Sequence, residues 1–395
     1  MKQLRYISLS LVLALTAAGC SGGGGNDNVE TTSNTGTSTT GGGTNTPPVS
    51  NNDALLSGQF ALLSATVGPN ARAVSTGSIT FDGNGNVSSG SGTTFNFSNN
   101  SVISTASTVT GGTYTVDSSR NIFGQITATG NGQTVTTSAT NGRISTNHVY
   151  AAANFNDNAG NSGVFALIRP IQNSSNSGLN GTFRFSVALV GAVQGFEFGN
   201  VTFNGSGGIT PGTTVTFSTG QSAQVSGGSY TLNADGSLVG SVSLNTGGSA
   251  TVRGFVGQDN TIGAVITDQN QNLGLGIGSP APTTVSSNAD LDGTGSFLAV
   301  RTSPTGGFIT GTAAFDGNGG IVPGNLLTLS NGATETITGG NYQINSDGTF
   351  ANAVVDTSNG VVTTANFLTL GQDKTSLSGV ITDNAGEQGM VILVK

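Results

Sequence analysis

Short runs in which apolar and polar residues alternate fill the chain from about residue 54 to its end. Gly111 to Asp117 and Gly227 to Asn233 are two such windows, and each alternates with a period of two residues. This period is typical of β-strands with one buried face, whereas an amphipathic helix needs a period of about 3.6. Because no stretch has the pattern of a long amphipathic helix, the sequence predicts an all-β fold.

The turns between these runs carry a repeated signal. The segment Phe81 to Gly85, of sequence FDGNG, recurs as Phe315 to Gly319 and, altered to FNGSG, as Phe203 to Gly207. An aromatic residue followed by Asp-Gly or Asn-Gly indicates a tight hairpin, since glycine accepts the positive φ that such turns require. Three copies of the turn predict one unit used three times.

The spacing of the copies sets the size of this unit. Phe60, Phe183 and Phe297 end three similar opening strands and are separated by 123 and 114 residues. This period is far longer than the roughly 20 to 50 residues of solenoid and propeller repeats, so each unit is expected to be a domain. The predicted organisation is a signal peptide over 1–19, a lipidated disordered tether over 20–53, and β-domains over 54–171, 178–279 and 290–395.

Turn signals within the first unit predict about eight antiparallel strands. Strands in sequence order favour a small up-and-down barrel, because closure removes the exposed edges of an open sheet. An eight-stranded sandwich has the same periodicity and stays as the alternative. The strands are expected near 58–66, 74–81, 86–97, 101–116, 122–129, 133–140, 143–153 and 163–169.

The N-terminus has the pattern of a targeting segment. Lys2 and Arg5 precede an apolar run over 6–18, which is too short for a comfortable membrane span. Ala17 to Cys20 resembles the lipobox of bacterial lipoproteins, although Ala17 stands where Leu is commonest. The resemblance implies that Cys20 is lipidated and holds the protein on a membrane, and Ser21 after it implies outer-membrane sorting. The expected location is the cell envelope, and exposure at the cell surface is left open.

The FDGNG-bearing units resemble the glycine-rich β-repeats of bacterial surface lipoproteins. More loosely, they are similar to lipocalin-type barrels and to the barrel domains of transferrin-binding-protein-like lipoproteins. This second resemblance concerns architecture alone, and no ligand-contacting motif carries over to residues of this chain. A function in metal acquisition is therefore not inferred from this resemblance.

Charge and reactive groups narrow the functional classes. Without residues 1–19 the chain keeps 9 basic residues (11 less Lys2 and Arg5) and 19 acidic ones, a formal charge of −10. An acidic chain with no basic cluster is not expected to bind nucleic acid. His148, in the strand-like run 146–153, is the sole histidine, and Cys20 is the sole cysteine. The sequence predicts no catalytic residue, no cofactor and no enzyme.

The acidic turns are the weak candidates for a metal. Asp82 with Asn84, and Asp316 with Asn318, offer oxygen ligands of the kind that Ca²⁺ takes, but both pairs lack the spacing of a complete calcium loop. Hairpin chemistry also accounts for these residues.

The leading hypothesis is a non-enzymatic, membrane-anchored surface lipoprotein that serves binding, adhesion or envelope structure. Its partner is a protein, a polysaccharide or a small ligand that the sequence does not identify. A small-ligand carrier of lipocalin-like type is the alternative, and it requires a barrel cavity of about 300 Å³ or more. A carboxylate enzyme that uses Asp235 with Asp268 is a third hypothesis.

Overall fold

The computed structural model describes residues 52–68, 71–303 and 306–395. The predicted signal peptide, Cys20 and the tether up to residue 51 lie outside the described residues. Within the described part, strands dominate and the helical elements are three short 3-10 turns. None of the helices in this part is long and apolar enough to cross a membrane.

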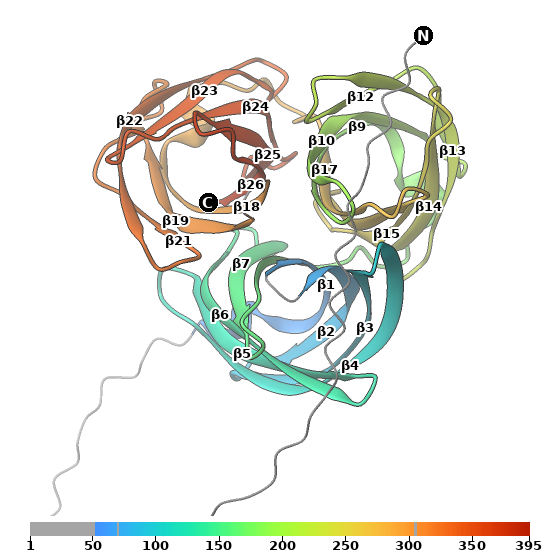
Figure 1. The fold of residues 1–395 in the computed structure, drawn as a ribbon. Helices are drawn as coiled ribbons and strands as arrows, with labels where there is room; N and C mark the ends of the chain where they lie inside the picture. The colour runs from blue at the N-terminus through green and yellow to red at the C-terminus, as the bar shows by residue number, and fades with distance from the viewer. Residues whose placement is uncertain (1–51, 69–70, 304–305) are drawn as a thin grey trace, which may run out of the picture. The chain divides into compact units, whose positions relative to one another are not determined.

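The first barrel is a closed meander of eight antiparallel strands (Figure 1). Each strand pairs with the next one along the chain, and the first strand pairs with the last to close the sheet. The strands are β1 (Ser57–Val67), β2 (Arg72–Asp82), β3 (Asn86–Ser98), β4 (Ser101–Val116), β5 (Asn121–Gly130), β6 (Gln133–Ile144), β7 (Tyr150–Asp157) and β8 (Ser162–Ile168).

The second barrel has the same order and closes between β9 and β17. Its third strand is divided in two, because Pro211 and Gly212 stand inside it and proline cannot donate a ladder hydrogen bond. The strands are β9 (Asn180–Val190), β10 (Gln194–Asn204), β11 (Gly208–Thr210), β12 (Thr214–Phe217), β13 (Ser222–Leu232), β14 (Ser237–Leu244), β15 (Ser249–Val256), β16 (Ile262–Asp268) and β17 (Leu273–Pro280).

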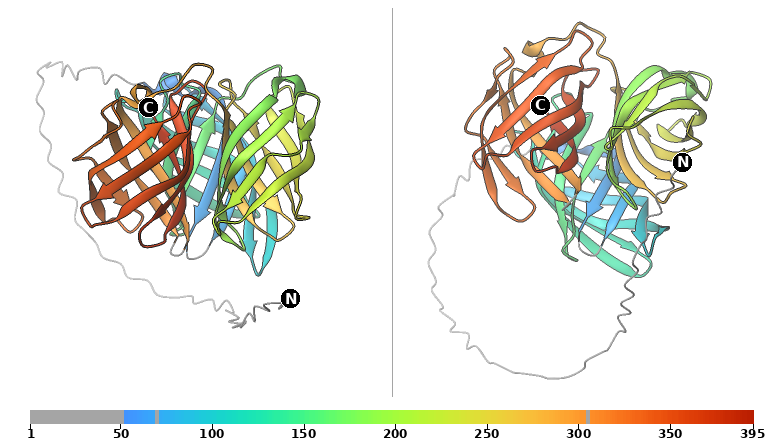
Figure 2. Two further views of the ribbon diagram at one scale, coloured as in Figure 1. Left: turned by 90° about the horizontal axis from the view of Figure 1, so that it is seen from above. Right: turned by 45° about the horizontal axis from the view of Figure 1, so that its top comes forward.

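The third barrel closes between β18 and β26, and Pro323 with Gly324 divides its third strand in the same way. Figure 2 shows that the strands of each barrel are inclined to the barrel axis. The strands are β18 (Gly293–Ser303), β19 (Gly307–Phe315), β20 (Ile321–Val322), β21 (Leu326–Leu329), β22 (Thr334–Ile344), β23 (Phe350–Thr357), β24 (Val362–Leu370), β25 (Ser376–Asp383) and β26 (Gln388–Val394).

The predicted all-β fold with three small up-and-down barrels is confirmed, and the sandwich alternative is wrong because each sheet closes on itself. One strand of the first unit was misplaced. The expected strand over 143–153 is divided between β6 and β7 by a turn at 145–149. His148 lies in this turn with φ of 60°, so it is not in a strand.

The repeated landmarks have separate structural roles. Asp82 caps the FDGNG turn, since its carboxylate accepts hydrogen bonds from the backbone N–H of Asn84 (2.7 Å) and of Asn86 (2.9 Å). Each barrel also has a Gly-Gly pair in its long fourth strand, at a β-bulge where the register of that strand shifts. The pairs are 111–112 in β4, 227–228 in β13 and 339–340 in β22. A Cβ on Gly228 would be 2.1 Å from the carbonyl oxygen of Ser241, so only glycine fits there.

Each barrel has its own interior core, and a further core lies between the barrels. Strands β7, β8, β17 and β26 are buried on both faces, which accounts for their near-continuous apolar sequences. Phe198 of the second barrel stacks on Phe367 of the third, with centroids 5.0 Å apart. The core between the barrels takes residues from all three, among them Leu63, Val67, Tyr150, Ile168, Ala188, Leu275, Val300, Met390 and Ile392.

Candidate ligand cavity in the second barrel

The second barrel encloses a cavity of about 360 Å³. Most of its lining is aromatic or aliphatic, and the alternation along β9 shows why. Phe183, Phe185, Val187 and Leu189 point inward, while Ala188 and Val190 between them point outward into the core between the barrels. A corresponding cavity in the third barrel measures only about 60 Å³. Similar folds with different inward side chains therefore leave very different internal volumes.

One end of this cavity is closed by a 3-10 turn, η2 (Asn176–Gly178). The Tyr230 hydroxyl donates to the backbone carbonyl oxygen of Leu179 (2.7 Å) or of Asn176 (3.0 Å). The side-chain oxygen of Asn176 accepts the backbone N–H of Leu232 at 2.8 Å. These contacts fix the turn across the end of the barrel.

The other end carries four strand connections. Val193, Ser218, Thr219, Thr246, Gly248, Asn270 and Asn272 contribute to the cavity lining from the β9–β10, β12–β13, β14–β15 and β16–β17 connections. Polar side chains therefore gather at this end, whereas rings and aliphatic groups line the interior. An apolar ligand with one polar group would fit this distribution.

Glu197 is the acidic side chain on the inner wall. It lies directly opposite Val187 in the β9–β10 ladder, so it shares the inward face of that residue. Among the described residues, no hydrogen bond or ion pair joins its carboxylate to a protein group. Burial raises the pKa of Glu197 to about 7, and the negative charge of Asp268 adds to this effect.

Asp268 lies at the end of β16 and is the second carboxylate in the lining. Its oxygens accept the backbone N–H groups of Asn270 and Asn272, each at 2.8 Å, and the side-chain amide of Asn272 at 2.7 Å. These bonds hold the carboxylate at the open end of the barrel. Among the described lining residues there is no Lys, Arg or His to offset the two acids.

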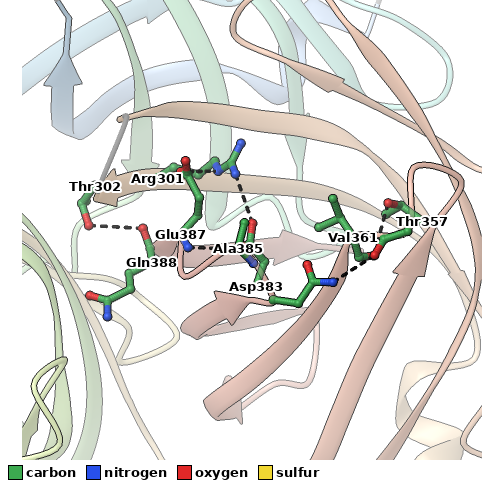
Figure 3. Close-up of polar contacts among 10 residues, drawn as sticks. Arg301, Thr302, Thr357, Val361, Asp383, Ala385, Glu387 and Gln388 are labelled. Carbon is green, nitrogen blue, oxygen red and sulfur yellow. Dashed lines mark hydrogen bonds and ion pairs between the residues drawn. The ribbon is translucent and has the colours of Figure 1, made fainter.

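The third barrel fills the equivalent region with a charged side chain of its own. Arg301 points inward and forms ion pairs with Asp383 (3.1 Å) and Glu387 (3.0 Å), as Figure 3 shows. Asp383 follows the sequence VIT in β25 just as Asp268 does in β16. Arg301 pairs with Gly307 and Gly389 in the third barrel, and Leu189 pairs with Gly195 and Gly274 at the same place in the second. The second barrel thus keeps the acid but has leucine where the third has arginine.

The sequence-based metal candidates lie in two separate hairpin turns outside this cavity. Asp82 and Asn84 share the turn after β2, and Asp316 and Asn318 share the turn after β19. Asp316 accepts backbone N–H groups of Asn318 and Gly320 at 2.8 and 2.7 Å. In the described part of the chain, no three His, Cys, Asp or Glu residues are grouped to hold a metal. Calcium at these turns stays a prediction.

The pair suggested for a carboxylate enzyme is not brought together. Asp235 lies in the β13–β14 turn at the closed end of the second barrel, where its carboxylate accepts from Ser237. Asp268 lies at the opposite, open end. Sequence reasoning missed Glu197, although an acid between two phenylalanines, Phe196 and Phe198, was a usable signal. Alternation puts the ring of Phe198, which stacks on Phe367 of the third barrel, on the outer face and the carboxylate on the inner one.

No family model and no curated protein sequence matches the chain. Solved structures with some similarity include transferrin binding protein B from serogroup B Neisseria meningitidis, with 11% identity, a TM-score of 0.25 and coverage of 81% of this chain. The match spans 65% of that protein, just under two thirds of its length. A mutant of the same protein from Haemophilus parasuis gives 9% identity, a TM-score of 0.26, and coverage of 85% and 75%. These TM-scores carry no argument about function.

Proposed function

We propose that this chain is a non-enzymatic binding protein of the cell envelope whose second barrel holds a small, mainly apolar ligand. The observation that supports this function is the cavity of about 360 Å³ inside β9 to β17. Ligand sites in proteins are commonly cavities of about 300 to 1,000 Å³ with apolar walls and a few polar groups. The cavity therefore favours the carrier hypothesis over adhesion or envelope structure.

The lipid anchor belongs to the same proposal. Its support is the lipobox-like sequence ending at Cys20, followed by a Gly, Ser and Thr-rich stretch. An acylated cysteine would hold the barrels beside a membrane, which is a source of apolar molecules. The first and third barrels would then act as structural neighbours that bury one side of the second.

A neutral apolar dye tests the binding function in the full mature chain. Nile red is expected to gain fluorescence on binding, and the gain should be lost in Ala250→Phe, because Ala250 lines the cavity and a benzyl group would fill it. Thr251→Phe is the matched control, since this neighbouring side chain is exposed on the outer face of β15. Equal binding by the native chain and both variants would contradict the proposal.

A further inference from the structure

We infer that the second barrel selects an amphiphile with a protonated amine or other cationic head, which pairs with Glu197 while its apolar part fills the cavity. This inference rests on the proposed function, since it assigns the chemical class of the ligand. It starts from an inward carboxylate that the protein leaves without a cationic partner.

The unpartnered acid is the first step. A charged group surrounded by protein normally has an opposite charge or several hydrogen bonds, because losing water otherwise costs several kcal/mol. Asp268 meets this requirement with three hydrogen bonds from its own turn. In the part of the chain that the structure describes, the Glu197 carboxylate has neither an opposite charge nor a hydrogen bond from the protein. A ligand that supplies a positive charge would relieve the cost at Glu197.

The third barrel contains such a positive charge in its own side chains. Its Arg301 guanidinium lies between Asp383 and Glu387 at the open end of that barrel, at distances of 3.1 and 3.0 Å (Figure 3). In the second barrel Leu189 takes the position of Arg301, because Leu189 pairs with Gly195 and Gly274 as Arg301 pairs with Gly307 and Gly389. Asp268 takes the position of Asp383. The acid is retained, but the cation is missing.

The charge of the lining disfavours the commonest apolar carrier ligands, which are fatty acids. A carboxylate head would meet Glu197 and Asp268 without a Lys, Arg or His among the described lining residues. Like charges at close range are destabilising where little water screens them. A cationic head instead meets two carboxylates and nearby aromatic faces such as Phe185 and Phe217, which also attract cations.

Three ligands of equal chain length test the inference on the full mature chain at pH about 8. Decylamine, decanol and decanoate are each titrated against bound Nile red. At this pH the amine is protonated, because ordinary alkyl ammonium groups titrate at a pKa of about 10.4. We expect decylamine to bind about tenfold tighter than decanol, a difference that corresponds to about 1.4 kcal/mol. Decanoate is expected to bind weakest.

Substitutions test whether Glu197 causes the preference for the amine. Glu197→Gln should reduce the ratio of decylamine to decanol affinity about tenfold. Asp235→Asn, at the closed end of the same barrel, is the matched control and should keep the ratio. Val187→Arg should abolish the preference for the amine, because its guanidinium would lie opposite Glu197, whereas the uncharged Val187→Met should retain it.

The two proposals fail in different ways. If Nile red and all three decyl compounds fail to bind, the ligand-binding function itself is wrong. A different result is that the compounds bind, but decanol or decanoate binds as tightly as decylamine, or Glu197→Gln leaves the affinity ratio unchanged. In that case only the inference of a cationic head group is wrong.

Discussion

The rings of Phe203 and Tyr230 meet edge to face in the second barrel, with centroids 5.0 Å apart and planes at 89°. Phe203 opens the FNGSG turn and Tyr230 belongs to the Gly-Gly-Ser-Tyr segment, so two landmarks of the sequence touch in space. The first and third barrels repeat the contact as Phe81 with Tyr114 at 5.0 Å and Phe315 with Tyr342 at 5.5 Å. This aromatic pair closes one end of every barrel.

Tyr230→Phe keeps the ring contact but removes the hydroxyl that bonds to Asn176 and Leu179. We expect the free energy that holds this end of the barrel closed to fall by about 0.5 to 1.5 kcal/mol, which is the net contribution of a typical hydrogen bond. Hydrogen exchange should accelerate at the Leu232 amide, which pairs with the same turn. Tyr114→Phe in the first barrel is the matched control, and unchanged exchange at Leu232 in Tyr230→Phe would show that the hydroxyl does not hold the turn.

Glu197 makes the stability of the second barrel depend on pH. Burial raises its pKa from 4.5 in the unfolded chain to about 7 in the folded barrel. Below pH 4.5 both states hold the proton, but between 4.5 and 7 the folded state keeps it while the unfolded chain loses it. The contribution of Glu197 to the free energy of unfolding therefore falls as the pH rises from about 4.5 through about 7, by an amount on the order of 3 kcal/mol.

Glu197→Gln removes this titration. The variant should be more stable than the native chain at pH about 8, and the difference should shrink toward pH about 4.5. Melting temperatures of both proteins across this range measure the effect. Asp268 and Tyr230 also face the cavity, but they are present in both proteins and cancel in the comparison. A difference that does not vary with pH would argue against the buried acid.

The hairpin turns should depend mainly on an oxygen at the capping position, and the charge of an aspartate there should add a smaller part. Asn204 accepts the backbone N–H groups of Ser206 and Gly208 at 2.8 and 2.9 Å, as Asp82 does in its own turn. Asp82→Asn should therefore keep the melting temperature near the native value, while Asp82→Ala should lower it by a few degrees. A similar loss in both variants would contradict this account of the turn.

The side chain of Asn86 and the backbone N–H groups of Asn86 and Asn84 lower the pKa of the Asp82 carboxyl. Its stabilising effect is present above the ordinary value of 3.8 and is lost as the pH falls through the lowered pKa. The same hydrogen bonds already use the oxygens that calcium would need. Chelation of calcium is expected to leave the melting temperature of the native chain unchanged, and a clear fall would support the metal prediction.

Cys20 is expected to decide where the protein is found in the cell. Cys20→Ala removes the thiol that would carry the acyl chains, each buried methylene of which contributes about 0.8 kcal/mol to membrane binding. The variant should move from the membrane pellet to the soluble fraction on fractionation. Ser21→Ala, which keeps the cysteine, is the control for membrane attachment. Persistence of the Cys20→Ala protein in a salt-washed pellet would remove the anchor from the proposal.

Local signals were sufficient to predict most of the fold. The Asp-Gly and Asn-Gly turns define hairpins because they depend on φ values and hydrogen bonds within five residues. Their threefold recurrence therefore predicted three units of about eight strands. The same local reasoning placed His148 in a strand, because residues 146 to 153 have strand-like composition. Tertiary pairing instead ends β6 at Ile144 and begins β7 at Tyr150.

The sequence by itself determined the turns, the strand count and the repeat, since these follow from short-range geometry. Only the tertiary structure decided the closure of each sheet, the burial of β1, β8 and β26 between barrels, and the cavity beside Glu197. A cavity is the space left after the inward side chains of all strands are combined, so no single segment encodes it. Leu189 and Arg301 make the difference clear, because this one position on the wall leaves the second barrel without the cation that the third one has.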